Sequence, residues 1–171
     1  PHVLPTPQWR LGVVENNGYL YSIGGLNGGG AVAGVYYAPI NPDGSVGTWT
    51  STTSLPQATH SSGVVVYSSH IFIFGGATSG NVNTVLSAPI NPDGTVGTWT
   101  TTTSLPQAER RQKAIEYNGY VYLIGGLAGS DSTAIYSAKL NSDGTVGTWT
   151  TLPVVLPAAF MMASIGDDSG N

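Results

Sequence analysis

The side chains best suited to bind a ligand occupy two neighbouring positions of a sequence that repeats about every 50 residues. Alignment on the Gly-Gly pairs fills these two positions with Trp9, His60 and Arg110, followed by Arg10, Ser61 and Arg111. Most of the repeat is constant while these positions vary, as expected of a specific ligand site, although drift at permissive positions gives the same pattern. Cations and an indole suit an anionic or polar ligand such as an acidic glycan, so the candidate ligand-binding residues are Trp9, Arg10, His60, Arg110 and Arg111.

Residues for catalysis or metal binding are sparse around these positions. Hydrolysis of a glycosidic bond needs two carboxylates, and only Glu109 and Asp131 accompany the candidate residues. Calcium takes about 6 to 8 oxygen ligands, whereas one aspartate stands alone on each of three separate turns, at Asp43, Asp93 and Asp143. The three histidines lack the spacing of metal ligands. We therefore expect turn-forming aspartates, no metal and no other cofactor.

The composition excludes several classes of partner. Only 8% of the 171 residues are charged, against about a quarter in an average domain, and the net charge is −4. Five basic residues cannot supply a phosphate-binding surface, so nucleic acid is not an expected partner. The longest apolar run, 152–163, is broken by two prolines and is too short to insert in a membrane. The Ser, Thr, Asn and Gly content favours an extracellular or cell-surface protein of bacterial type.

A long repeat organises the chain. The segment Asn-Pro-Asp-Gly-Ser-Val-Gly-Thr-Trp at 41–49 returns almost unchanged at 91–99 and at 141–149. Its tryptophans, Trp49, Trp99 and Trp149, are therefore spaced by 50 residues. Gly-Gly and Leu-Pro pairs follow the same step. A period near 50 is typical of propeller or solenoid arrays.

Each repeat contains four expected strands. In the second repeat they cover about 60–67, 71–74, 82–90 and 96–102. The turn at 91–94 carries Pro where φ is fixed and Gly where a positive φ is needed, which favours a hairpin. The run Ile-Phe-Ile-Phe at 71–74 is apolar throughout, so both faces of its sheet should be covered. The three repeated tryptophans should be buried between neighbouring sheets.

The order of these features resembles the kelch repeat. An aromatic and aliphatic strand ends in Gly-Gly, a tyrosine such as Tyr36 or Tyr136 follows, then Trp49 or Trp149, and Leu-Pro opens the next repeat. Two departures are visible. Leu86 replaces the aromatic residue in the second repeat, and the Asn-Pro-Asp-Gly hairpin lengthens the stretch before the tryptophan. The same hairpin is also weakly similar to the sialidase Asp-box.

The resemblance implies an all-β fold, a partial β-propeller of four-stranded antiparallel blades. Three complete blades would cover about 5–54, 55–104 and 105–155, and the segment 156–171 would supply the first strand of a fourth. Propellers have about 4 to 8 blades. We therefore expect further blades, from a longer parent chain or from another copy, as partners of this segment.

Strand direction alternates, so the connections fall on two opposite faces. The loops after the Gly-Gly pairs and the loops that join successive blades share one face, which we call the loop face. Kelch-like propellers usually carry their binding site there, as the resemblance implies. The arginines Arg10, Arg110 and Arg111 belong to this face. Most acidic residues belong to the turns of the other face, namely Glu15, Asp43, Asp93, Asp143, Asp167 and Asp168.

Two functions remain open. We favour a non-enzymatic kelch-type binding or scaffold module that presents its loops to a protein or glycan partner. The alternative is a fragment of a propeller-borne carbohydrate-active enzyme, sialidase-like or oxidase-like, with most catalytic residues in other blades. Arg110 and Arg111 are sequence neighbours, so side-chain alternation along a strand should point them apart and weaken a sialidase-like arginine cluster. An oxidase-like copper site with a linked cysteine is not available, because the segment has no cysteine.

Overall fold

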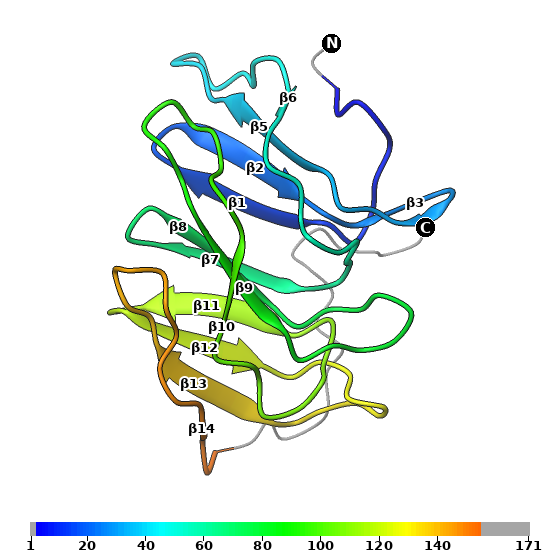
Figure 1. Cartoon of the computed structure of the whole chain (residues 1–171), viewed down its shortest axis with the longest axis vertical. Helices are drawn as coiled ribbons and strands as arrows, with labels where there is room; N and C mark the ends of the chain where they lie inside the picture. Colours follow the sequence, from blue (N-terminus) through cyan, green and yellow to red (C-terminus); the bar gives the residue numbers. More distant parts are fainter. Residues whose placement is uncertain (1–2, 155–171) are drawn as a thin grey trace.

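The computed structural model describes residues 3–154, all of them in strands, turns and loops. Three four-stranded antiparallel sheets lie one after another along the long axis (Figure 1). The first sheet contains β1 (Gly12–Asn16), β2 (Tyr19–Ile23), β5 (Val35–Pro39) and β6 (Thr50–Ser51). The second contains β7 (Gly63–Tyr67), β8 (His70–Phe74), β9 (Val85–Pro89) and β10 (Thr100–Thr102). The third contains β11 (Lys113–Tyr117), β12 (Tyr120–Ile124), β13 (Ile135–Lys139) and β14 (Thr150–Thr151).

One small hairpin stands outside these sheets. It pairs β3 (Leu26–Asn27) with β4 (Gly30–Ala31), inside the loop that follows the first Gly-Gly pair. The part of the chain that is described contains no helix, and therefore none able to cross a membrane. The expected first strand of a fourth unit, in 156–171, lies outside the described residues.

The expectation of four antiparallel strands per repeat is confirmed, but three strands are shorter than predicted. The strand expected over 82–90 covers only Val85–Pro89. The strand expected over 60–67 begins only at Gly63. The strand expected over 96–102 is limited to Thr100–Thr102. The reason is the turn before it, where Val96 forms only an isolated bridge with Ile90 and the chain then leaves the sheet.

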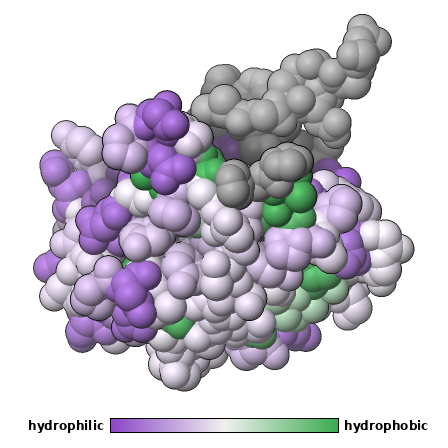
Figure 2. All heavy atoms as spheres, turned by 90° about the horizontal axis from the view of Figure 1, so that it is seen from above, coloured by the Kyte–Doolittle hydropathy of each residue, from purple (hydrophilic) through white to green (hydrophobic). Residues whose placement is uncertain are grey.

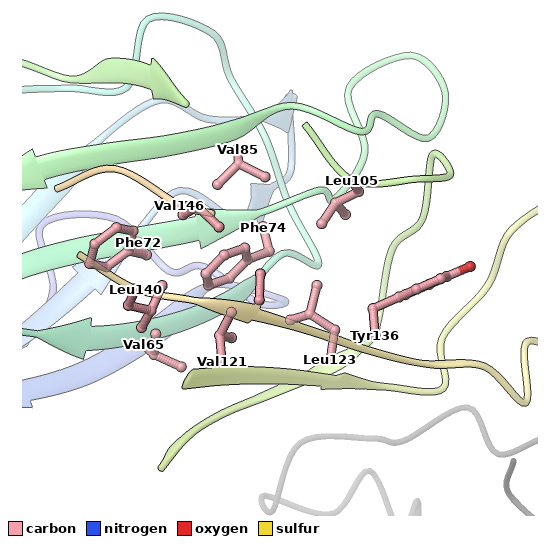
Figure 3. Packing of buried hydrophobic residues seen from close by; sticks show 11 residues of the cluster. Val65, Phe72, Phe74, Val85, Leu105, Val121, Leu123, Tyr136, Leu140 and Val146 are labelled. Carbon is pink, nitrogen blue, oxygen red and sulfur yellow. The ribbon is translucent and has the colours of Figure 1, made fainter. Parts of the chain in front are cut away.

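Side chains from neighbouring sheets fill the space between them. Between the first and second sheets, the buried strand residues include Tyr21, Ile23, Ile71 and Ile73. Between the second and third sheets, they include Phe72, Phe74, Val121 and Leu123 (Figure 3). Alternate residues of β8 thus enter different clusters, as its unbroken apolar sequence predicted. Full burial of one such side chain contributes about 1.5 to 3 kcal/mol.

The first strands of the three sheets lie next to one another, with β7 between β1 and β11. Two glycines permit this approach. A Cβ at Gly12 would lie 2.4 Å from Val64 Cγ2, and a Cβ at Gly63 would lie 3.0 Å from Ala114 Cβ. The third sheet has Lys113 at the equivalent position.

Hydrogen bonds also join the last strand of one sheet to the next sheet. The Val96 N–H donates to Thr52 Oγ1 over 2.8 Å, and the Thr53 hydroxyl donates to the Val96 carbonyl. The Trp99 indole N–H donates to the Thr53 carbonyl over 2.9 Å. The same set recurs 50 residues later, among Thr102, Thr103, Val146 and Trp149. We call each set an inter-sheet clamp.

The prediction that all three repeated tryptophans are buried is correct for one of them. Trp99 is 8% exposed and lies between the first and second sheets. Trp149 is half-buried and packs edge-on against Phe74, with ring centroids 5.8 Å apart. Trp49 is also half-buried, because no sheet precedes the first one among residues 3–154.

Candidate functional site

The candidate ligand-binding residues belong to a backbone motif that is the same in all three sheets. Before the first strand of each sheet, one residue pairs with the residue that follows the Gly-Gly pair. The three bridges are Trp9 with Leu26, His60 with Ala77, and Arg110 with Leu127. The predicted equivalence of Trp9, His60 and Arg110 is therefore confirmed. The backbone is constant here while the side chain changes.

The next position holds a left-handed backbone in each sheet. The φ angles are 56° at Arg10, 58° at Ser61 and 63° at Arg111. Such a conformation costs a residue other than glycine about 1 to 3 kcal/mol, and residues that adopt it are enriched at functional sites. The three residues are also joined to one another. Ser61 N–H donates to the Arg10 carbonyl over 2.9 Å, and Arg111 N–H donates to the Ser61 carbonyl over 2.7 Å.

This backbone gathers the basic side chains around His60. Burial lowers the pKa of His60 below its ordinary value of 6.5, and Arg10, Arg110 and Arg111 lower it further. The pKa of Arg111 is lowered by burial and then by Arg10 and Arg110, while Asp131 opposes this. The imidazole is thus mainly neutral at pH 7, and its Nδ1 lies 3.0 Å from the Ser61 hydroxyl. We call Arg10, His60, Arg110 and Arg111 the arginine cluster.

The sequence-based expectation that Arg110 and Arg111 point apart does not apply. It assumed an extended strand, but β11 begins only at Lys113 and Arg111 is left-handed. Both guanidinium groups act on His60. Two neighbouring arginines therefore contribute to one positive region.

Trp9 occupies the matching backbone position in the first sheet, with 49% of its surface exposed. Of the five predicted residues, the structure thus brings together four, and it leaves Trp9 as an exposed aromatic side chain on the same face.

A groove lies beside Arg110, between the loops that follow the second and third Gly-Gly pairs. It encloses about 510 Å³ and is lined by polar side chains of Asn81, Gln107 and Arg110 and by Leu127. The Asn81 side-chain amide donates to the Leu127 carbonyl over 2.7 Å, which joins the two loops. Arg110 Nε is buried and has no hydrogen-bond partner. A buried donor without an acceptor is costly.

Glu109 is a feature that the sequence did not single out as a site residue. It is fully buried, and Ser132 lies near its carboxylate without a hydrogen bond of ordinary geometry. Burial raises its pKa above the ordinary value of 4.5. Gln8 and Thr59, which are neutral, occupy the equivalent positions in the first two sheets. This break in the repeat is the only sequence signal that pointed to Glu109.

Replacing Glu109 by Gln should stabilise the protein at pH 8 and have little effect at pH 4. The raised pKa means that folding favours the protonated carboxyl, so the wild type loses stability as pH rises through the unfolded and then the folded pKa. Glutamine has no proton to lose. Urea denaturation at both pH values measures the difference, and the exposed Asp131→Asn variant is the control. If the variant gains less free energy of unfolding over the wild type at pH 8 than at pH 4, the raised pKa of Glu109 is contradicted.

The acidic residues of the opposite face form turns. Asp43 Oδ1 accepts hydrogen bonds from the N–H and the hydroxyl of Ser45, at 2.9 and 2.6 Å. Asp93 and Asp143 make the same pair of bonds to a threonine. The hydroxyl contact, followed by the backbone one, lowers the pKa of each aspartate. The prediction that these aspartates serve the turns is confirmed.

The two faces differ in charge as expected among the described residues. The aspartate turns and the β1–β2 and β7–β8 turns lie at one end of the sheets, and the loops after the Gly-Gly pairs lie at the other (Figure 1). Strongly polar residues form only scattered patches on the surface drawn in Figure 2. With so few charges, a cluster of three arginines dominates the potential near it. Asp167 and Asp168 fall outside the described residues.

No protein-family model matches the chain. No curated protein matches it either. Within residues 3–154, no group of three or more His, Asp or Glu side chains could hold a metal ion.

Proposed function

We propose that this chain is a segment of a kelch-type β-propeller that acts as a binding or scaffold module. Three four-stranded sheets of the same strand order support the proposal, because each packs on the next through the same clamp and the same glycine contact. Further blades, from a parent chain or another copy, would complete the ring. The composition favours an extracellular or cell-surface location for it.

The ligand would be an anionic or polar protein or glycan bound at the loop face. One observation carries this proposal: two neighbouring positions of the first and third sheets place Arg10, Arg110 and Arg111 close enough to His60 of the second sheet to lower its pKa. Like charges repel, so their gathering costs free energy unless an anion offsets it. A carboxylate or sulfate can accept two hydrogen bonds from one guanidinium. Trp9 would add a stacking surface.

Paired substitutions test which face binds. Arg110→Ala with Arg111→Ala should weaken binding of an acidic glycan or acidic protein from an array by about tenfold or more, because two charge-assisted contacts are lost. Asp43→Ala with Asp93→Ala should leave binding unchanged, since these aspartates serve turns on the other face. If the arginine pair variant keeps binding and the aspartate pair variant loses it, the ligand binds the face that carries the aspartate turns, and the proposal is wrong.

The buried Glu109 favours a second candidate, a carbohydrate-active enzyme whose other groups lie in further blades. A carboxyl whose pKa is raised by burial can donate a proton to a leaving group that reaches it, and both oxygens of Glu109 are buried among the described residues. The Glu109→Gln variant separates the two functions. A binding module keeps its ligand affinity in this variant, whereas a glycosidase loses turnover of an aryl glycoside while still binding it.

A further inference from the structure

A second cavity lies away from the arginine cluster, between the first and second sheets. It encloses about 470 Å³ and reaches the surface beside the exposed Pro56 and Gln57. Leu55, Ile73 and Leu86 form apolar walls. Its lining includes Leu86, at which the second repeat departs from the other two.

The side chain at position 86 differs from its equivalents in the other two sheets. Leu86 of β9 pairs with Ile73, as Tyr136 of β13 pairs with Leu123 and Tyr36 of β5 with Ser22. The first and third sheets thus carry a tyrosine where the second carries a leucine. The leucine lacks the phenol ring.

The geometry of the first sheet shows where that ring would lie. Tyr36 folds over Gly34, since a Cβ added there would lie 3.0 Å from Tyr36 Cε2 and 3.1 Å from its hydroxyl oxygen. The carbonyls of Gly34 and Thr84 accept the same hydrogen bond from the first glycine of each Gly-Gly pair, so these two residues are equivalent. Thr84 lines the cavity.

The third sheet follows the first. Ala134 accepts the equivalent bond, and the Tyr136 ring extends along its strand toward the loops (Figure 3). A small residue therefore accompanies the tyrosine in both sheets, Gly34 with Tyr36 and Ala134 with Tyr136. The second sheet instead has Thr84 with Leu86, and both residues line the cavity.

The lining suits a neutral ring with one polar end. The aliphatic walls contain no charged side chain, and hydroxyl groups are offered by Thr59, Thr84 and Thr101. Apolar cavities of this kind bind small aromatic molecules, and a few polar groups orient the ligand.

We propose that this cavity binds a phenol ring, either of a small free phenol or of a tyrosine side chain on a partner. The ring would occupy the space that Tyr36 and Tyr136 fill in their own sheets. The site is separate from the arginine cluster and does not depend on the function proposed for it.

The test uses the whole chain and p-cresol, which is the side chain of tyrosine. NMR titration should show one site, with shifts at Ile73 and Leu86, and 4-methylcyclohexanol should bind at least tenfold more weakly. Leu86→Tyr combined with Thr84→Ala copies the third sheet and should abolish binding. If N-acetyl-tyrosinamide binds as well as p-cresol, the natural occupant is a tyrosine side chain. If p-cresol alone binds, the natural occupant is a small free phenol.

A reciprocal variant keeps the test valid even if the Leu86→Tyr, Thr84→Ala protein does not fold. Tyr136→Leu with Ala134→Thr copies the second sheet and should create a second p-cresol site, which raises the stoichiometry from one to two. Arg110→Ala with Arg111→Ala should leave p-cresol binding unchanged. The proposal is overturned if p-cresol causes no shifts at the lining residues, if the saturated alcohol binds equally well, or if neither double variant changes the number of sites.

Discussion

Replacing Trp99 by alanine should lower the free energy of unfolding by about 3 to 5 kcal/mol. The indole is 8% exposed and belongs to the cluster between the first and second sheets. Its N–H also donates to the Thr53 carbonyl over 2.9 Å, so the substitution removes both a buried ring and part of the inter-sheet clamp. Urea denaturation followed by circular dichroism measures the loss.

Trp49 provides the matched control. It has the same sequence neighbours but is only half-buried, and its indole makes no inter-sheet hydrogen bond within the described part of the chain. Trp49→Ala should therefore cost distinctly less than Trp99→Ala. Equal losses from the two variants would show that the tryptophans contribute through their own sheet and not through the contact between sheets.

Replacing Gly76 by alanine should destabilise the protein by about 3 kcal/mol or more, through backbone strain and steric overlap together. Its φ is +104°, which L-residues rarely adopt. A Cβ there would lie 2.2 Å from Ser62 Oγ and 2.8 Å from the His60 carbonyl oxygen. Thermal or urea denaturation gives the magnitude.

Gly80 is the control for this substitution. No atom lies within 4 Å of a Cβ built there, and its φ is not in the left-handed region. Gly80→Ala should change stability by less than about 0.5 kcal/mol. A tolerated Gly76→Ala would mean that the Gly-Gly pairs are not needed for the close approach of His60 to the second sheet.

The strand order within each sheet could be predicted from the sequence because local signals agreed. The Asn-Pro-Asp-Gly turn, the apolar 71–74 run and the Gly-Gly pair each mark the end of a strand to within a few residues. The length of the last strand could not be predicted in this way. It depends on how far the chain follows β9 after the turn, and side-chain packing between sheets decides that.

The positions of the candidate site could be found from the repeat, whereas its chemistry could not. Alignment alone placed Trp9, His60 and Arg110 on one backbone position, because the repeat fixes the backbone. It could not show that Arg111 adopts a left-handed conformation or that Glu109 is fully buried. These properties arise from contacts between sheets, which have no signature within one repeat.

The inter-sheet clamp has a consequence for how such a chain folds. Its donors and acceptors are identical at both interfaces, so the clamp holds two sheets together without selecting which two. A folding chain can therefore dock its first sheet on its third and skip the second, a known hazard of near-identical repeats. Side chains that differ between the two interfaces must prevent this. The first sheet presents Tyr21 and Ile23 to the second sheet, whereas the second sheet presents Phe72 and Phe74 to the third. Correct assembly thus rests on the few side chains that the repeats do not share.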